Sequence, residues 1–334
     1  MSADVRLFHP FDTGAVNVDE DRTTQCIWRA KPMLEWQRWS GATALQSFKP
    51  HAIELERSGL VLSTRPPERL TLAIVQVTRS KTETLGMIAE AWTALRPGGW
   101  CIVDGAKTDG IDSIYKTVGA RLPVSGYHSK AHGRVFWVQK PEEEPPSVAN
   151  WKMEADIKEV TPGSYTQAGI FSERGPDEGS VYFLDTIPND LTGRIADLGA
   201  GWGFLSRTLL ERGPSITEMH LFEAEAKALT CARLNVTDQR ATFHWSDVTR
   251  EDLGRFDTII MNPPFHTDRT AKVALGHGFI RAAQRSLERS GSLFMVANRH
   301  LPYETVLNEC FADWSEIQSN AKYKIIHATR PRGK

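Results

Sequence analysis

The feature that most constrains the fold is a regular alternation of strand-like and helix-like segments over residues 194–297. Apolar runs predict five strands, at Arg194–Leu198, Glu218–Phe222, Ala241–His244, Phe256–Met261 and Gly291–Ala297. Helix-compatible segments lie between them, at Phe204–Arg212, Glu225–Asn235 and Lys272–Leu287. Such alternation predicts an α/β fold in which helices cover both faces of a parallel sheet. A short helix at Tyr303–Phe311 and a final strand at Tyr323–Ala328 are expected to complete it.

The length of the chain, 334 residues, exceeds what one hydrophobic core usually supports, so two domains are expected. The segment from Pro141 to Ser147 is acidic and rich in proline, which is typical of a linker. We therefore predict an N-terminal domain over residues 1–140, a linker over 141–150 and a C-terminal domain over 151–334.

The N-terminal part carries a faint echo of the C-terminal part. Leu95–Asp104 parallels Leu287–Ala297, since in each a helix ends near glycine and an apolar strand follows. Ser129–Val138 parallels Ser319–Ala328 at nearly the same spacing. These echoes predict two α/β domains of one architecture.

Composition excludes several classes of protein. No apolar run is long enough to span a membrane, and Met1–Gly14 lacks the basic and apolar regions of a signal peptide. The four cysteines show no paired spacing, so neither a zinc site nor a disulfide framework is expected. We predict no membrane association, no metal and a reducing, cytoplasmic setting.

The distribution of charge is more informative than its sum. The formal net charge of −1 argues against a protein held on nucleic acid by charge alone. However, residues 262–300 hold six basic side chains and two acids, and the residues after Glu316 hold five basic side chains and no acid. The two stretches predict a phosphate-binding rim or, as the alternative, an ordinary solvated surface.

A glycine-rich turn follows the first predicted strand of the C-terminal half. The sequence from Asp197 to Gly203 reads Asp-Leu-Gly-Ala-Gly-Trp-Gly and opens the next helix. Glycines at such a turn let the backbone approach a ligand closely. The spacing differs from that of a pyrophosphate-binding turn, and the preceding acid would repel phosphate. It suits the cationic amine of S-adenosylmethionine, although a purely structural turn is the alternative.

Two further acids follow the next strands. Glu223 ends the second strand, where nucleoside-binding folds of this type place an acid that binds ribose hydroxyls. Asp247 follows the third strand, where it could accept from an adenine amine or, equally, act as a helix cap or turn residue. Open α/β sheets bind ligands at these strand ends.

The most specific feature is Asn262-Pro263-Pro264-Phe265, directly after the fourth strand. Two consecutive prolines remove backbone donors and end the strand. What remains is rich in acceptors: the Asn262 side-chain carbonyl and the Pro263 backbone carbonyl. Two acceptors that bind both hydrogens of an aromatic amine would direct its lone pair toward a methyl donor, and Phe265 could stack on the base.

Together these motifs make the chain recognisable. Asp197-x-Gly-x-Gly and Asn-Pro-Pro-Phe resemble motifs I and IV of class I amino-methyltransferases. Three further segments, Gly169-Ile-Phe-Ser172 with Asp177-x-Gly-Ser180, His266 after the Asn-Pro-Pro-Phe motif, and Val296–Tyr303, resemble the bacterial small-subunit ribosomal RNA guanine-N2 methyltransferase family. The resemblance is strong over about 165–330 and loose over 1–140.

The resemblance implies two Rossmann-like methyltransferase domains in tandem. The C-terminal one would have a seven-stranded class I sheet that binds S-adenosylmethionine, and the N-terminal one would be degenerate. Asp197, Gly199 and Gly201 would line the amino-acid end of the cofactor, Glu223 its ribose and Asp247 its adenine. Phe171 would pack near the cofactor or belong to the core.

The resemblance also implies how the substrate is bound. Asn262, Pro263, Pro264 and Phe265 would hold a guanine of 16S ribosomal RNA. His266 is expected to contact substrate or to be structural, rather than to act as a base, and Arg269 lies in the first basic stretch. The expected partner is ribosomal RNA or the small ribosomal subunit, and the expected state is a monomer.

The N-terminal domain lacks both signatures. Its strand Leu72–Val77 runs into Thr78-Arg79-Ser80-Lys81 where the other half has Asn-Pro-Pro-Phe, so a second active site is not expected. Arg79 and Lys81 could contact RNA phosphates, or the domain could only stabilise its partner. Three alternative functions remain open: a large-subunit rRNA guanine-N2 methyltransferase, an adenine-N6 methyltransferase, and a non-catalytic RNA-binding assembly factor.

Overall fold

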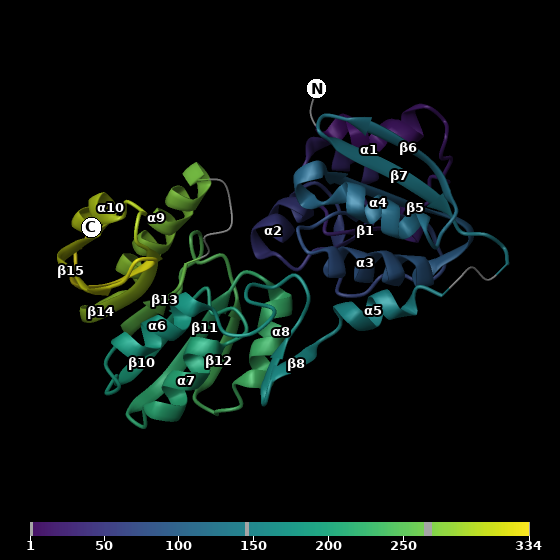
Figure 1. The fold of residues 1–334 in the computed structure, drawn as a ribbon. Coiled ribbons are helices and arrows are strands. Elements are labelled where there is room, and N and C mark those ends of the chain that lie inside the picture. Colours follow the sequence, from purple (N-terminus) through teal and green to yellow (C-terminus); the bar gives the residue numbers. More distant parts are fainter. Residues whose placement is uncertain (1–2, 144–146, 264–268, 334) are drawn as a thin grey trace. The chain divides into compact units, whose positions relative to one another are not determined.

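The computed structural model describes residues 3–143, 147–263 and 269–333. The chain forms two compact units, Met1–Ile157 with Gln167–Gly169, and Lys158–Thr166 with Ile170–Lys334. Each unit contains a 7-stranded sheet flanked by helices (Figure 1). The predicted fold class, two α/β domains of one architecture, is confirmed.

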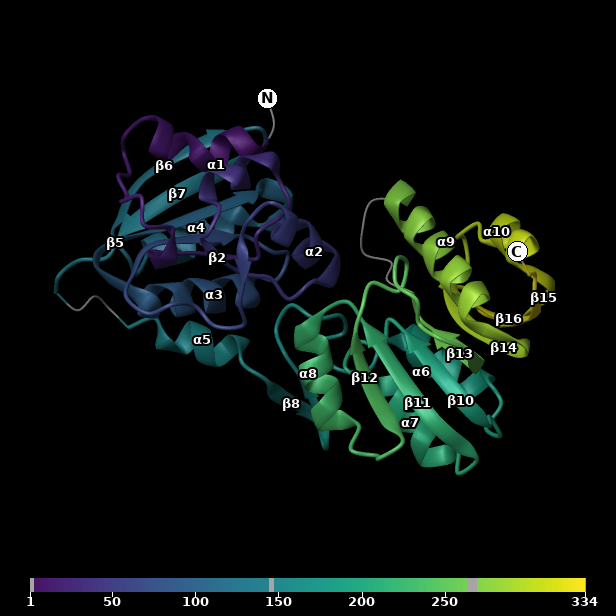
Figure 2. The same cartoon turned by 180° about the vertical axis from the view of Figure 1, so that it is seen from behind.

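In the second unit, five parallel strands are followed by an antiparallel pair, in the order β12-β11-β10-β13-β14-β16-β15. Figure 2 shows β12, β11 and β10 side by side, with α8 next to β12. The elements are β8 (Lys158–Thr161), β9 (Ser164–Thr166), α6 (Glu178–Thr186), β10 (Gly193–Leu198), α7 (Phe204–Arg212), β11 (Ile216–Glu223), α8 (Ala226–Asn235), β12 (Ala241–Trp245), β13 (Phe256–Met261), α9 (Arg269–Ser286), β14 (Leu287–Asn298), α10 (Glu304–Cys310), β15 (Phe311–Ser319) and β16 (Tyr323–Pro331).

The first unit repeats this arrangement in the order β3-β2-β1-β4-β5-β7-β6. Its elements are α1 (Ala3–Asp12), the 3-10 helix η1 (Arg22–Thr24), β1 (Gln25–Trp28), the 3-10 helix η2 (Leu34–Trp39), β2 (Thr43–Leu45), α2 (Lys49–Arg57), β3 (Val61–Leu62), β4 (Leu70–Gln76), α3 (Lys81–Ala94), β5 (Leu95–Ala106), the 3-10 helix η3 (Lys107–Asp109), α4 (Ile111–Gly119), β6 (Val124–Lys130), β7 (Gly133–Gln139) and α5 (Ala149–Ala155).

The central strands are apolar on both sides because each sheet has a hydrophobic core on either face. In the second unit Ala196 and Ile259 face the core formed with α9 and α10. Their neighbours Ile195 and Ile260 face the other core, formed with α6, α7 and α8. The sheet is therefore packed between two hydrophobic cores.

Several features differ from expectation, and strands β8 and β9 and helix α6 are among the elements that were not predicted. The edge strand β15 is absent from the predicted elements, because most of its side chains are exposed and it lacks an apolar face. Helix α5 belongs to the first unit, although the predicted linker ended at residue 150, since Trp151 is buried in the core that α3 and α4 form. Across the described ranges, no helix combines the length and apolar character that crossing a bilayer requires.

The pairing registers align the two sheets residue by residue. Leu72 pairs with Trp100 in the first unit as Thr258 pairs with Ser292 in the second. Counting on from these pairs, Gln76 occupies the position of Asn262. The register between the first two strands of each unit likewise places Gln46 at the position of Glu223. The weak sequence echo is therefore a full structural repeat.

Candidate active site

The carboxyl ends of β10, β11 and β13 bring together three of the predicted motifs in the second unit. A cleft there is lined by the glycine-rich turn, by Asn262, and by residues that precede or open α6 and α7. Its lining residues are Phe171, Ser172, Asp177, Ser180, Gly199, Ala200, Gly201, Trp202, Phe204, Leu205 and Asn262. The cleft thus lies where open α/β sheets bind their ligands.

Asp197 is fully buried at the end of β10. Its Oδ2 accepts a hydrogen bond from the Ser206 hydroxyl at 2.7 Å, while Oδ1 has no hydrogen-bond partner among the described residues. Burial raises the pKa of this carboxyl to about 7. A buried acceptor without a donor is costly, so the position is suited to a ligand that brings its own donors.

Glu223 supports the glycine-rich turn from the neighbouring strand β11. Its Oε2 accepts from the Gly201 backbone N–H at 2.9 Å and its Oε1 from the Glu225 N–H at 2.8 Å. The pKa of Glu223 is raised, because the effect of burial is larger than that of these backbone hydrogen bonds, which lower it. Gly199 and Gly201 have φ angles of +77° and +55°, which glycine adopts without strain.

Asn262 follows β13 with its side-chain amide held at one end. Its Nδ2 donates to the Ser180 hydroxyl at 2.8 Å and to Asp177 Oδ2 at 3.1 Å. Asp177 and Ser180 were noted in the sequence only as part of the family resemblance. Their Asp-x-x-Ser spacing indicates only a helix cap, and it gives no sign of a contact with a residue more than 80 positions away.

The remaining predicted cofactor contacts are less decisive. Phe171 lines the cleft and is 38% exposed, so it is not an ordinary core residue. The Asp247 carboxylate accepts from the backbone and the hydroxyl of Thr249 and pairs with Arg250, as a turn residue does. An adenine contact by Asp247 stays a prediction.

Several predicted substrate contacts cannot be placed. Pro264, Phe265 and His266 lie outside the described residues, and the side chain of Arg269 is not described either. Pro263 is buried and lies two residues after the end of β13.

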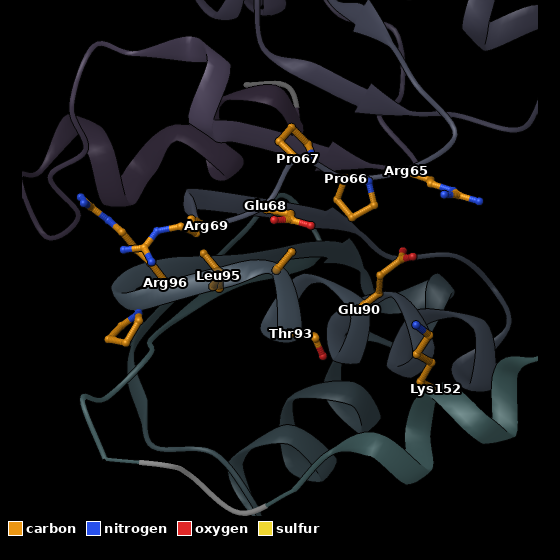
Figure 3. Close-up of a pocket in the computed structure, with 12 residues that line it drawn as sticks. Arg65, Pro66, Pro67, Glu68, Arg69, Glu90, Thr93, Leu95, Arg96 and Lys152 are labelled. Atoms are coloured by element: carbon orange, nitrogen blue, oxygen red, sulfur yellow. The ribbon is translucent and has the colours of Figure 1, made fainter.

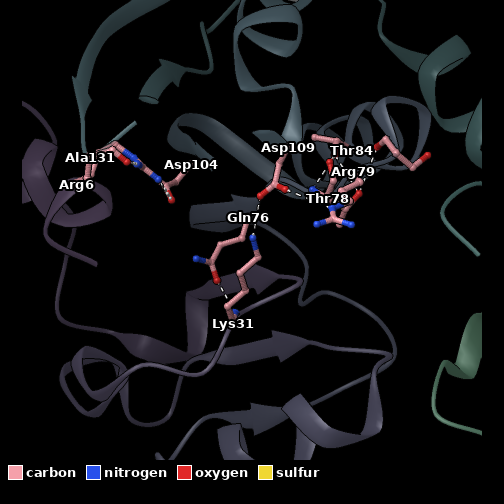
Figure 4. A network of polar contacts seen from close by, with 10 residues as sticks. Arg6, Lys31, Gln76, Thr78, Arg79, Thr84, Asp104, Asp109 and Ala131 are labelled. Atoms are coloured by element: carbon pink, nitrogen blue, oxygen red, sulfur yellow. Dashed lines mark hydrogen bonds and ion pairs between the residues drawn. The ribbon is translucent and has the colours of Figure 1, made fainter. Parts of the chain in front are cut away.

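At the equivalent position in the first unit, the Gln76 side chain extends to Lys31 (Figure 4). The strand registers place Ile27, Arg29 and Lys31 where the second unit has Asp197, Gly199 and Gly201. Arg29 keeps the left-handed backbone, with a φ of +56°, and its guanidinium lies 3.5 Å from a Glu83 carboxylate oxygen. This unit therefore lacks both the acid and the open glycine turn.

In the first unit, glutamines occupy the positions of Glu223 and Asn262. Gln46, at the position of Glu223, donates to the Ala30 carbonyl at 2.7 Å. Gln76, at the position of Asn262, accepts from the Lys31 backbone N–H, so its carbonyl is engaged within the unit. The register also corrects the sequence comparison, because Gln76, not Thr78, aligns with Asn262.

The predicted RNA contacts of the first unit lie near this equivalent position. Arg79 is 65% exposed and lies 3.9 Å from Asp109, and the Lys81 ammonium donates to the Ser113 hydroxyl at 3.0 Å. Both are accessible, but neither lies in the cleft of the second unit.

The basic stretch after Glu316 is largely neutralised in the fold. Lys322 pairs with Glu178 at 2.6 Å, Lys324 with Glu304 at 2.7 Å, and Arg330 with Asp313. Lys324 is only 5% exposed. This stretch therefore offers less free positive charge than its sequence suggests.

A separate recess of about 660 Å³ lies at the amino ends of β4 and β5 in the first unit (Figure 3). Four cationic side chains line it, Arg65, Arg69, Arg96 and Lys152, together with the acids Glu68 and Glu90. Figure 3 shows Arg69 and Arg96 next to one another. With four cations against two acids, the recess has a net positive lining. Glu90 also accepts a hydrogen bond from the Trp28 indole N–H at 2.6 Å.

Comparison with known proteins is consistent with this geometry. The family described as methyltransferase small domain matches residues 164–327. Ribosomal RNA small subunit methyltransferase C of Shewanella piezotolerans is 31% identical over 239 residues, which cover 69% of each chain. The corresponding protein of Shewanella loihica is 30% identical over 258 residues, 74% of this chain and 73% of its own. The chain belongs to the ribosomal RNA small subunit methyltransferase C family.

Membership of this family confirms the resemblance seen in the sequence and the methyltransferase activity. A T. thermophilus 16S rRNA N2 methyltransferase, solved with AdoMet and guanosine, has a TM-score of 0.78 and 21% identity. The match covers 97% of this chain and 91% of that one, so both units share its fold. Ribosomal RNA large subunit methyltransferase G of Klebsiella pneumoniae is 32% identical, but over only 56% of this chain and 50% of its own.

Proposed function

We propose that this protein transfers a methyl group from S-adenosylmethionine to the exocyclic N2 amine of a guanine in 16S ribosomal RNA. The observation that carries the proposal is the orientation of Asn262. Its Nδ2 hydrogens are bound by Asp177 and Ser180, which leaves Oδ1 as an acceptor beside the glycine-rich turn.

S-adenosylmethionine is the cofactor, and it supplies an electrophilic methyl group on a sulfonium. The residues of the second unit fit it. The unpartnered Oδ1 of Asp197 can accept from its ammonium group, and the positive φ angles of Gly199 and Gly201 keep the turn free of side chains. Glu223, whose two oxygens accept from backbone N–H groups of the turn and of Glu225, would also bind the ribose hydroxyls.

The chemical task of the protein is to position a weak nucleophile. The lone pair of an aromatic amine is delocalised into the ring, so the amine reacts poorly in the plane of the base. Asn262 Oδ1 and the Pro263 carbonyl would accept its two hydrogens and favour a tetrahedral nitrogen. Orientation of this kind contributes several kcal/mol to catalysis, on the order of 7–11 in the best intramolecular cases. Solvent takes the proton that the methylated amine releases.

RNA binding would involve both units. The cationic recess around Arg69 and Arg96 is suited to phosphates of the RNA backbone, and the exposed Arg79 and Lys81 provide further contacts. His266 and Arg269 remain candidate substrate contacts. We expect the protein to act as a monomer in the cytoplasm, on ribosomal RNA or on the small ribosomal subunit.

The direct test is methyl transfer from labelled S-adenosylmethionine to 16S rRNA and to small subunits, with nucleoside analysis of the product. We expect N2-methylguanosine with the wild type and a loss of at least about 100-fold with Asn262→Ala, which removes one of two acceptors. N6-methyladenosine, or label only in 23S rRNA, would replace the proposal with one of the alternative targets. Absence of any labelled RNA would favour the assembly factor.

A further inference from the structure

The orientation of an asparagine side chain decides what it can bind. One end of the amide carries two donors and the other end one acceptor carbonyl, and the two ends have nearly the same shape. A reversed Asn262 would direct its hydrogens at the substrate amine, which also carries hydrogens. The proposed function therefore requires that something in the protein fixes this amide.

Two side chains outside the Asn-Pro-Pro-Phe motif contact the donor end of Asn262. Ser180 Oγ lies 2.8 Å from Nδ2 and Asp177 Oδ2 lies 3.1 Å from it. An ionised carboxylate only accepts hydrogen bonds, so a reversed amide would place its carbonyl oxygen against a negative charge. The Asp177 contact thus favours the amide orientation that directs Oδ1 away from this carboxylate. The Ser180 hydroxyl, which can donate or accept, adds a second hydrogen bond that holds Nδ2 in place.

The segment that carries these two residues is itself tightly built. Asp177 is the N-cap of α6, and its Oδ2 also accepts from the Ser180 backbone N–H at 3.0 Å. The start of a helix favours a negative charge at this position. Gly179 lies between them, and a Cβ there would lie 2.9 Å from the Tyr323 ring and 3.0 Å from Asp177 Oδ2. The segment thus combines three roles. Asp177 caps the helix and binds Asn262, Gly179 avoids a clash with Tyr323, and Ser180 binds Asn262.

We infer that Asp177 and Ser180 are positioning residues that fix the Asn262 amide with its carbonyl toward the substrate. The consequence is selectivity for a donor. The site accepts an exocyclic –NH2 group and disfavours a base edge that presents a carbonyl or a ring nitrogen lone pair. This inference rests on the proposed function for its substrate, but the fixed amide can be tested without it.

A double-mutant cycle separates positioning from a purely structural role. We expect Ser180→Ala to lower the single-turnover rate of methyl transfer by about tenfold or more, as loss of an outer residue that orients a functional group typically does. The dissociation constant of S-adenosylmethionine should change less than about twofold, because Ser180 does not act through the cofactor. In an Asn262→Ala background the same substitution should change the rate by less than about twofold, because its target is gone. Thr186→Ala, which removes a hydroxyl from the far end of α6, is the matched control.

An equal loss in both backgrounds would overturn the inference, as would loss of cofactor binding in proportion to the rate. A second measurement needs no activity. The side-chain amide signals of Asn262, assigned by their absence in Asn262→Ala, should be protected from hydrogen exchange in the wild type and unprotected in Ser180→Ala. Equal protection in both proteins would refute the fixed amide, whereas failure of the wild type to methylate RNA would refute only the proposed function.

Discussion

Replacing Asp197 with asparagine should make the protein more stable at pH 8 and less stable at acid pH. The pKa of Asp197 is raised from 3.8 to about 7 by burial, so the folded state holds a proton that the unfolded state releases between these values. Stability of the wild type therefore falls as pH rises from about 4 to about 7. At 1.36 kcal/mol per pKa unit, the fall amounts to roughly 4 kcal/mol.

The asparagine side chain removes this pH-dependent loss but brings its own cost. It would keep an acceptor for the Ser206 hydroxyl, while its amide hydrogens would take the place of the unpartnered Oδ1 of Asp197. A buried donor without a partner costs about 1–3 kcal/mol. The wild type has already lost about 1 kcal/mol at pH 4.5, so the variant should be less stable than the wild type there by about 0–2 kcal/mol. At pH 8 the variant should be more stable by about 1–3 kcal/mol.

The assay is urea denaturation of both proteins at several pH values, followed by a fluorescent reporter in the second unit. Asp185→Asn, which changes an exposed acid of the same unit, is the control and should show no such change of sign. A stability difference that stays constant from pH 4.5 to 8 would refute the reasoning, because it would mean that Asp197 is ionised throughout.

The same carboxyl should make cofactor binding depend on pH. An ammonium ligand binds the ionised form, and with a pKa of about 7 only about a tenth of the free protein is ionised at pH 6. The wild type should therefore bind S-adenosylmethionine about tenfold more weakly at pH 6 than at pH 8. Calorimetry checks this, and a flat profile would show that Asp197 does not contact the ammonium.

Three further predictions test other parts of the structure. Calorimetry should show one S-adenosylmethionine per chain, since the first unit lacks the acid and the open glycine turn; a second equivalent of similar affinity would contradict this. Gly203→Ala should lower the free energy of unfolding by about 1–3 kcal/mol, because φ is +87° and a Cβ would lie 2.7 Å from a methyl group of Val236. An unchanged urea midpoint would contradict this prediction. The double substitution Arg69→Glu and Arg96→Glu should weaken RNA binding and reduce the slope of log affinity against log salt concentration by about 1.5–2. Arg38→Glu, on the same unit but outside the recess, is the control and should have neither effect. Equal effects of the two changes would exclude the recess as a phosphate site.

The sequence alone determined the architecture of the second unit, because its signals are local. Continuous apolar runs mark strands buried on both faces, and the glycine-rich turn and Asn262-Pro-Pro-Phe stand directly at strand ends. The predicted strand Phe256–Met261 and helix Phe204–Arg212 match the structure at both ends. The exposed edge strand β15 was missed, since an edge strand with few buried side chains has no comparable pattern.

Only the tertiary structure decided which charges and polar groups meet. Basic residues of the C-terminal stretch pair with acids such as Glu178 and Glu304, which lie on helices α6 and α10. The orphaned oxygen of Asp197 and the fixed amide of Asn262 likewise depend on long-range packing. Backbone propensity and hydrophobic periodicity act over a few residues, whereas a pKa or a hydrogen-bond partner depends on whatever the fold brings within a few ångströms.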